Sequence, residues 1–400
     1  MNRNPYLYFG LIILIYLVFN PFIALFFSIY LNKKIKLINN LNLFFFSFSF
    51  AYLFFSREIG VNFYEYATDD VEVYVEFYKS VSATNFSVLF NNFFTNPSGN
   101  EPIYLIFIKL LNFISFQNIS VFIFLHYFIL FYLLYFLVKK ISVRYAPLLI
   151  LFYFFTFPIS LYSIAHVWRQ QIAIFLFFIL VMYRNNIKNK YIFHILLFST
   201  VFIHLSNIYF FLIYIFYHFS IKFLKETPKN VIIISLILMT IEKIIFTLFL
   251  ILLSLLGLDK LLTYTDGLSA NKDVFFKLLP IYLSLTIMVL FLNKKNVNLF
   301  TLTFFTLSAL LMPIVIPSLN SIYDRFINFT IPLIGVLFVA YFINNKMYRF
   351  IPILSIIIFL IGSLRLFLEY KNNVGIISFI GYKHGFDPFL GIIKLFVLNI

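Results

Sequence analysis

An arginine stands beside a strongly apolar stretch in the segment His166-Val167-Trp168-Arg169-Gln170-Gln171, which directly precedes residues 172–182. A charged side chain next to hydrocarbon is costly and marks a functional site by default. A cation at a helix start also opposes the helix dipole, which favours anions there. Binding a phosphate group through paired guanidinium hydrogen bonds would explain the place of Arg169. The alternatives are that its side chain reaches to the membrane interface or forms a structural ion pair.

Two carboxylates, Asp70 and Glu101, could take a proton from a hydroxyl group. Asp70 precedes Tyr74 by four residues, so the two side chains would share one face of a helix. The alternative for Asp70 is a solvated acid in a loop. Glu101 stands directly before Pro102, which is typical of a helix start, so capping is the alternative for Glu101.

His204 lies in a polar break, Phe202-Ile203-His204-Leu205-Ser206-Asn207, within an otherwise apolar stretch. A neutral histidine there could act as a general base or could be a buried, hydrogen-bonded core residue. The pair Asp324-Arg325 stands at the start of a predicted helix at 326–343. These two adjacent charges could bind a ligand or simply neutralise each other at the surface.

The composition indicates which solvent surrounds these residues. Hydrophobic residues make up 62% of the 400 residues and charged residues 11%, against roughly 25% charged residues in soluble domains. Polar surface is too scarce to cover so much apolar surface, which predicts an all-α polytopic integral membrane protein. A spanning helix needs about 20 apolar residues, so one transmembrane domain over residues 1–400 has room for about 10–12 transmembrane helices.

Several kinds of chemistry have no support in the sequence. The chain has no cysteine, which excludes disulfides, thiolate metal sites and cysteine nucleophiles. It has no phosphate-binding glycine loop and no metal-ligand spacing, so we expect neither a cofactor nor a metal nor a nucleotide. The net charge of +15 does not indicate nucleic-acid binding, because the lysines lie in short clusters between apolar stretches.

Apolar runs predict the helices that position these residues, at 6–31, 37–56, 119–138, 146–163, 167–183, 231–256, 277–292, 298–316, 326–343 and 350–368. The stretch 102–115 is apolar but too short to span, which predicts a re-entrant or interface-lying helix. The stretch 191–219 is basic at both ends and broken near His204. It is predicted to form either two half-helices that enter and leave the membrane or one long broken helix.

The charges predict an orientation. Six basic clusters fall on one side of this arrangement: Lys33, Lys34 and Lys36; Lys139, Lys140 and Arg144; Arg184, Lys188 and Lys190; Lys222, Lys225 and Lys229; Lys294 and Lys295; Lys346 and Arg349. Of the 15 acidic residues only Glu226 lies in these loops, so the positive-inside rule makes them cytoplasmic. The amino terminus, the main loop 57–101 and the tail 369–400 are then extracytoplasmic. The first apolar stretch is expected to be a retained helix, since it lacks a basic n-region and a cleavage site.

The order of several short motifs resembles the EpsG-like proteins, which are polytopic polymerases of exopolysaccharide and O-antigen repeat units, functionally of the Wzy type. The motifs are Arg57 to Gly60, Asp70 with Tyr74, Glu101-Pro102 with Tyr104, Arg169-Gln170 with Ala173, and His204 with Ser206. The resemblance covers residues 50–210 by motif and the remainder by topology. One departure is that Gly60 and Asp70 are separated by nine residues, whereas the family has the two nearly adjacent.

The resemblance implies an enzyme at the outer face of the bacterial cytoplasmic membrane. Such an enzyme moves a glycan from undecaprenyl pyrophosphate to a sugar hydroxyl of another lipid-linked unit, without metal or nucleotide. A chain-length regulator is a partner that the resemblance allows. The hypothesis assigns the pyrophosphate to Arg169, Arg57 and Arg325, acid–base chemistry to His204, Asp70 and Glu101, and the glycan to Tyr74, Tyr104, Trp168, Gln170 and Asp324.

Two other interpretations stay open. One is another multi-span glycosyltransferase that uses a polyprenyl phosphate, or an O-antigen ligase. The other is a flippase or exporter of the lipid-linked sugar, which is not an enzyme. The charged candidates gather on one face, and the sequence shows no internal repeat, which argues against transport through a central path.

Overall fold

The computed structural model describes residues 5–31, 36–56, 70–83, 101–156, 159–255, 272–290, 297–315 and 320–372. Every regular element in these ranges is a helix, as the sequence predicts. The chain divides into two compact units within the predicted transmembrane domain. The first comprises residues 1–89, 105–179 and 352–400, and the second comprises residues 90–104 and 180–351.

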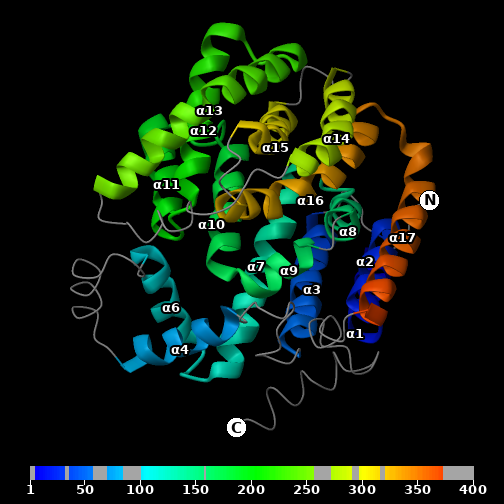
Figure 1. Ribbon diagram of the computed structural model, residues 1–400. Coiled ribbons are helices and arrows are strands. Elements are labelled where there is room, and N and C mark those ends of the chain that lie inside the picture. The colour runs from blue at the N-terminus through cyan, green and yellow to red at the C-terminus, as the bar shows by residue number, and fades with distance from the viewer. Residues whose placement is uncertain are drawn as a thin grey trace. The chain divides into compact units, whose positions relative to one another are not determined.

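The helices of the two units are shown in Figure 1. Those lying wholly or largely in the first unit are α1 (Pro5–Val18), α2 (Pro21–Leu31), α3 (Lys36–Phe55), α4 (Asp70–Ala83), α6 (Pro102–Ile114), α7 (Ile119–Ile141), α8 (Ala146–Thr156), α9 (Ile159–His166), α10 (Trp168–Met182) and α17 (Ile351–Asn372). Those of the second unit are α11 (Lys190–Ser199), the short 3-10 helix η1 (Thr200–Phe202), α12 (Asn207–Leu224), α13 (Pro228–Leu255), α14 (Lys272–Leu290), α15 (Val297–Val315), α16 (Asn320–Asn344) and η3 (Tyr348–Phe350).

Three helices in the described ranges are long and apolar enough to cross a membrane: Ile38–Phe55 in α3, Ile119–Ile141 in α7, and Asn207–Leu224 in α12. Other predicted spans coincide with shorter apolar helical stretches of 10–17 residues, including parts of α13, α14, α15, α16 and α17. The protein is therefore a helical membrane protein. The figure of about 10–12 crossings stays a prediction.

An antiparallel pair of helices, α3 and α7, forms the centre of the first unit. Phe44 packs against Phe128 at 5.8 Å between ring centroids, while Phe54 packs against Tyr127 at 5.6 Å. At the other end of α3, Lys139 Nζ donates a hydrogen bond to Asn40 Oδ1 at 3.0 Å. The lysines at 36, 139 and 140 thus gather at one end of the pair, and Phe54 and Tyr127 lie toward the other.

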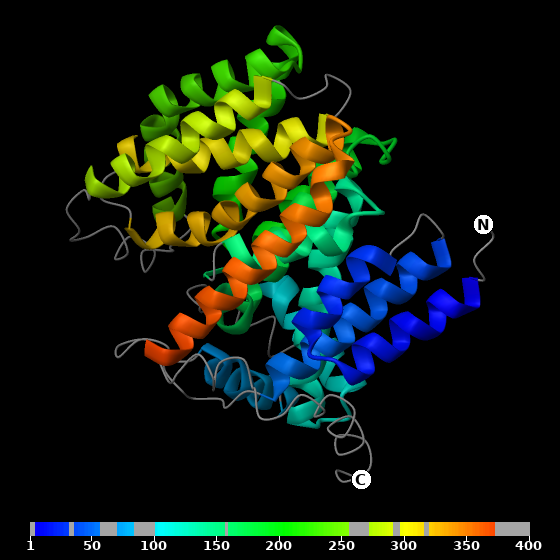
Figure 2. The same cartoon turned by 90° about the vertical axis from the view of Figure 1, so that its right-hand side faces the viewer.

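The structure corrects the single helix predicted over 6–31. The hydroxyl of Tyr16 donates to Ser28 Oγ at 3.2 Å, although residues twelve apart on a straight helix would be about 18 Å apart. The chain therefore folds back between α1 and α2, where Asn20 Oδ1 accepts the backbone N–H of Phe22 at 2.9 Å. Figure 2 shows α1, α2 and α3 side by side in blue. The prediction of an extracytoplasmic amino terminus assumes one membrane crossing by a single helix over residues 6–31. The structure has two helices there instead of one.

Helix α17 joins this group by packing closely on α2 and α8. The rings of Phe26 and Phe359 are 4.7 Å apart between centroids, and the hydroxyls of Tyr30 and Ser355 share a hydrogen bond at 3.0 Å. Gly362 is buried, and a Cβ atom at this position would overlap the ring of Phe155. The glycine therefore permits the close approach of α17 to α8.

The second unit contains a helical hairpin, which decides between the two alternatives for residues 191–219. The ring of His194 lies 5.7 Å from that of His218, and the ring of Phe198 lies 5.2 Å from that of Phe211. In these contacts the residue number rises along α11 and falls along α12, so the two helices are antiparallel. The break at 203–206 is the tip of the hairpin. One long broken helix is excluded by these contacts.

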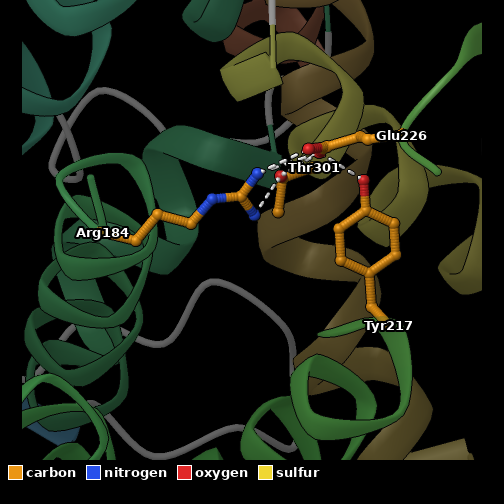
Figure 3. A network of polar contacts seen from close by, with 4 residues as sticks. All are labelled: Arg184, Tyr217, Glu226 and Thr301. Atoms are coloured by element: carbon orange, nitrogen blue, oxygen red, sulfur yellow. Dashed lines mark hydrogen bonds and ion pairs between the residues drawn. The ribbon is translucent and has the colours of Figure 1, made fainter. Parts of the chain in front are cut away.

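The two ends of this hairpin are joined by a partly buried ion pair (Figure 3). The Arg184 guanidinium, just before α11, contacts the Glu226 carboxylate, just after α12, with Nη2–oxygen distances of 2.8 and 3.0 Å. Tyr217 Oη donates to Glu226 Oε1 at 2.7 Å, and Arg184 Nη1 donates to Thr301 Oγ1 of α15 at 3.1 Å. Burial lowers the pKa of Arg184, but the adjacent carboxylate more than offsets this and leaves that pKa above its ordinary value.

Helix α15 is the centre of the second unit and contacts α13, α14 and α16. Its residues 299–311 are all buried, and the hydroxyls of Thr303, Thr306 and Ser308 donate to carbonyls of the same helix, for example Thr306 Oγ1 to Leu302 O at 2.9 Å. The neighbouring helix α16 begins at Asn320, six residues before the predicted start at 326. Asp324 and Arg325 therefore lie inside this helix and not in the loop predicted before it.

Two glycines give a matched test of helix packing. Gly362→Ala should destabilise the protein by about 1–3 kcal/mol, because the Phe155 ring must move. Gly10→Ala in α1 meets no atom within 4 Å, and it should be neutral or stabilise by up to about 1 kcal/mol. Thermal unfolding in detergent measures both. Equal effects of the two changes would show that α17 does not pack on α8 in this way.

The ion pair predicts an asymmetric response to mutation. Glu226→Gln should cost about 3 kcal/mol, because Arg184 then stays largely buried without a countercharge. The double change Arg184→Met with Glu226→Met should cost less than Glu226→Gln alone, since no charge is left behind. Unfolding in detergent compares them, with Glu72→Gln on an exposed face of α4 as the control. A larger loss in the double variant would contradict this reading.

Candidate functional site

Helix α4 presents one buried face and one charged face. Val71, Tyr74, Tyr78 and Val81 are buried, with exposed fractions of 0 to 4%, whereas Glu72, Glu76 and Lys79 are exposed. Asp70 is the first residue of the helix, where a negative charge favours the helix dipole, and it is partly exposed. The helix therefore places Tyr74 in the interior, one turn after a carboxylate that stays in contact with solvent.

Two polar contacts dock α4 on α6. The hydroxyls of Tyr78 and Ser115 share a hydrogen bond at 2.6 Å. Lys109 Nζ donates to the backbone oxygen of Val81 at 2.9 Å, which satisfies a carbonyl at the C-terminal end of α4. The opposite side of α6 exposes large apolar side chains, among them Leu110 and Phe113. A thirteen-residue helix with this surface fits the predicted interface-lying element.

An indole ring organises the break between α9 and α10. Trp168 is fully buried and stacks on Tyr74 at 5.3 Å and on His126 at 4.3 Å between ring centroids. Its Nε1–H donates to the backbone oxygen of Ala165 at 3.0 Å, and the hydroxyl of Tyr127 donates to the same oxygen at 2.9 Å. A carbonyl freed where α9 ends is thus paired twice. We call these five residues the Trp168 cluster.

Arg169 lies beside the Trp168 cluster, in the first turn of α10. Its guanidinium carbon is 5.5 Å from the centroid of the Tyr74 ring, within the range of a cation–π contact. The side chain is partly exposed, whereas Tyr74 and Trp168 beneath it are buried. Residues from α4 and α10 thus come together to support one arginine. Tyr74, Trp168 and Arg169 are three of the site residues that the sequence predicts.

The predicted glycan-binding residues are mostly buried in this conformation. The exposed fractions are 4% for Tyr74, 1% for Tyr104, 0% for Trp168 and 3% for Gln170. The rings of Tyr74 and Trp168 stack on each other. In this conformation the two rings support Arg169, and a direct role in glycan binding stays a prediction.

Other predicted residues fall outside this group. Arg57 lies outside the described ranges, and so do the side chains of Asp324 and Arg325. Glu101 directly precedes α6 and is partly buried, which agrees with a helix start at Pro102. His126 belongs to the Trp168 cluster but is not among the residues predicted from the sequence. Its only sign in the sequence is its position as a histidine within the long apolar helix α7.

His204 occupies the tip of the α11–α12 hairpin in the second unit. Its Nδ1 lies 2.6 Å from Ser206 Oγ, and the backbone N–H of Ser206 donates to the same nitrogen at 3.3 Å. The neighbouring Asn207 opens α12 and is fully buried. Helix α12 has 18 residues and is about 27 Å long, nearly the thickness of the hydrocarbon core, so the tip is far from Arg184 and Glu226 at the hairpin's base.

Each unit, taken separately, keeps its candidate residues apart from its basic clusters. In the first unit the Trp168 cluster contacts the Phe54 end of α3, and Lys139 binds Asn40 near the other end. In the second unit His204 lies at the hairpin tip, and Lys190 and Lys222 lie near its base. This is the arrangement on which the predicted orientation depends.

The absence of cysteine allows a direct test of that orientation. Glu76→Cys on α4 and Arg144→Cys after α7 each introduce one thiol at an exposed position. In intact cells a membrane-impermeant maleimide should label position 76, and position 144 should react only after permeabilisation. Labelling of position 144 from outside, with position 76 protected, would reverse the orientation.

Comparison with known proteins identifies a family. The model of the EpsG family matches residues 48–384, which is most of the chain and includes the Trp168 cluster, Arg169 and His204. No curated protein matches. No solved structure matches either.

Proposed function

Since this chain belongs to the EpsG family of Wzy-type polysaccharide polymerases, we propose that it joins lipid-linked oligosaccharide repeat units at the outer leaflet of the bacterial cytoplasmic membrane. The donor is a glycan on undecaprenyl pyrophosphate. The acceptor is a sugar hydroxyl of a second lipid-linked unit. The observation that carries the proposal is a partly exposed arginine fixed on a buried aromatic support, at the end of its unit away from the basic clusters.

The proposed reaction exchanges one bond at the anomeric carbon. The acceptor oxygen forms a bond to this carbon, and the bond to the pyrophosphate oxygen breaks. The acceptor proton passes to a base, and the lipid pyrophosphate leaves with its negative charge. The transition state therefore gathers negative charge on the leaving group, and a preorganised cation there lowers the barrier.

Arg169 is the proposed cation for the leaving group. Its place over the Tyr74 ring orients the guanidinium, whose planar donors suit a phosphate oxygen. Tyr74 in turn is fixed by Trp168. Arg57 and Arg325 stay proposed as further pyrophosphate ligands, and Gln170 and Asp324 as glycan ligands.

The acceptor needs a group that removes its proton. Asp70 and Glu101 are partly exposed carboxylates, and both belong to the motifs that resemble the EpsG-like proteins. Asp70 is the first residue of the helix that carries Tyr74. His204 is the third candidate and belongs to the second unit. We propose that one of these three groups is the base.

Surface polysaccharide on a gel tests the proposal in a deletion strain. The wild-type chain should restore a ladder of lengths, and Arg169→Ala should leave single units and lower polymer by about 10²–10³-fold at equal protein level. Tyr74→Phe should keep the ladder and Tyr74→Leu should weaken it, since Phe keeps the ring that contacts Arg169 and Leu does not. The control is Arg144→Ala, an exposed arginine outside this group, which should keep the ladder.

The alternatives give other patterns in the same assay. Loss of all surface sugar in the deletion strain would indicate a flippase or exporter. Loss of one sugar from each unit would indicate a single-addition glycosyltransferase, and a full set of long chains that stays on the lipid carrier would indicate a ligase. An unchanged ladder in Arg169→Ala would exclude the pyrophosphate role of this arginine.

A further inference from the structure

Two lysines come together at the base of the α11–α12 hairpin. Lys190 precedes His194 by one helical turn on α11, and Lys222 follows His218 by one turn on α12. The two imidazole rings lie 5.7 Å apart between centroids. Because the helices are antiparallel, this contact places Lys190 opposite Lys222, one turn nearer the base. We call these four residues the hairpin patch.

Electrostatic contacts within the patch agree with this register. Lys222 interacts electrostatically with both imidazoles, and Lys190 interacts with His218 from the neighbouring helix. Lys190 and Lys222 are exposed, and the two histidines are partly exposed. Both lysines therefore lie on the face where the two helices meet, and both are accessible from outside the protein.

The hairpin has no acid that balances these lysines. Glu226 is the only acidic residue between positions 180 and 241. Its carboxylate already accepts hydrogen bonds from Arg184, Tyr217 and Thr301. Like charges brought together repel each other, so an anion from outside the chain would stabilise the patch.

The apolar surroundings of the patch indicate the kind of anion. Each of its four members is followed in the sequence by a large exposed apolar side chain, with exposed fractions from 55 to 83%: Tyr191, Ile195, Phe219 and Phe223. The Nζ atom of Lys222 lies 4.9 Å from the centroid of the Phe219 ring. A free anion would leave these side chains in water, whereas a phospholipid supplies a phosphate and acyl chains together.

We propose that the hairpin patch binds the phosphate of an anionic phospholipid, with Lys190 and Lys222 on the phosphate oxygens. The acyl chains lie against Ile195 and Phe219. The lipid belongs to the leaflet at the hairpin base, which the predicted orientation makes cytoplasmic. It neutralises the two lysines and connects the two helices from the lipid side. All of these residues belong to the second unit, and the inference does not depend on the proposed reaction.

Lipid binding to the purified full-length protein in detergent tests the site. Native mass spectrometry should show tighter binding of phosphatidylglycerol than of phosphatidylcholine with the same acyl chains, because only the first has a net negative charge. Lys190→Gln with Lys222→Gln should weaken phosphatidylglycerol binding about 30-fold, since each lysine near a lipid surface contributes roughly fivefold. Lys190→Arg with Lys222→Arg should keep the binding. The matched control, Lys225→Gln with Lys229→Gln, removes two exposed positive charges outside the patch and should stay close to wild type.

Thermal unfolding separates lipid binding from folding. Without added lipid, Lys190→Gln with Lys222→Gln should unfold at the wild-type temperature or above it, because a repulsion between like charges is removed. With phosphatidylglycerol the wild type should become the more stable protein, since a ligand stabilises only the form that binds it. A double glutamine variant that is destabilised equally with and without the lipid would overturn the proposal.

Three binding results would also overturn it. Equal affinity for phosphatidylglycerol and phosphatidylcholine would exclude recognition of the lipid's charge. An equal loss in the control pair would show a diffuse attraction in place of a defined site. Displacement of phosphatidylglycerol by inorganic phosphate at comparable concentration would indicate a site for free phosphate. Each readout measures binding or stability, so a failure of the polymerase proposal would leave these results unaffected.

Discussion

Backbone amides and carbonyls need partners inside hydrocarbon, and three helix breaks within the described residues show how the chain supplies them. At the break between α1 and α2, the side chain of Asn20 accepts the N–H of Phe22. Where α9 ends, Trp168 and Tyr127 both donate to the carbonyl oxygen of Ala165. At the tip of the α11–α12 hairpin, the N–H of Ser206 is received by His204. Side chains can meet this demand only if they are polar, so breaks at depth concentrate groups that can also do chemistry. The two candidate positions described here, around Arg169 and around His204, both lie at such breaks.

The second organising element is the division of charge within each unit. The antiparallel pairing of α3 and α7 follows from aromatic contacts along the whole interface, and it carries lysines to one end as a consequence. In the second unit the two ends of a hairpin return to one place, where Arg184 and Glu226 neutralise each other. The single acid among the basic loops thus has a structural role, because it holds together two helices that otherwise meet lipid on one side. Arg184 thus belongs to a basic cluster that predicts the membrane orientation, and it also forms the ion pair with Glu226.

Much of the helical arrangement could be predicted, since long apolar runs such as 119–138 and 350–368 have only one stable form in lipid. Two local predictions also hold, since Arg169 stands at a helix start and Asp70 and Tyr74 belong to one helix. It did not predict the turn between α1 and α2, although Asn20-Pro21 was an available signal, because the apolar run continues through it. Nor could it show that Trp168 stacks between residues of α4 and α7. Such contacts depend on how helices distant in sequence meet, and His126 looked like any histidine buried in a helix.

Trp168 is the only tryptophan of the chain, and it is fully buried in the cluster that supports Arg169. Its emission under selective excitation therefore reports on this one place and on no other. Stacking on His126 and Tyr74 brings two ring neighbours whose positions depend on α7 and α4. A ligand that moves Arg169, or a change that shifts α4 away from α10, would alter the packing around the indole. The protein thus carries a native fluorophore at the base of its candidate site, and occupancy of that site can be followed optically without any label.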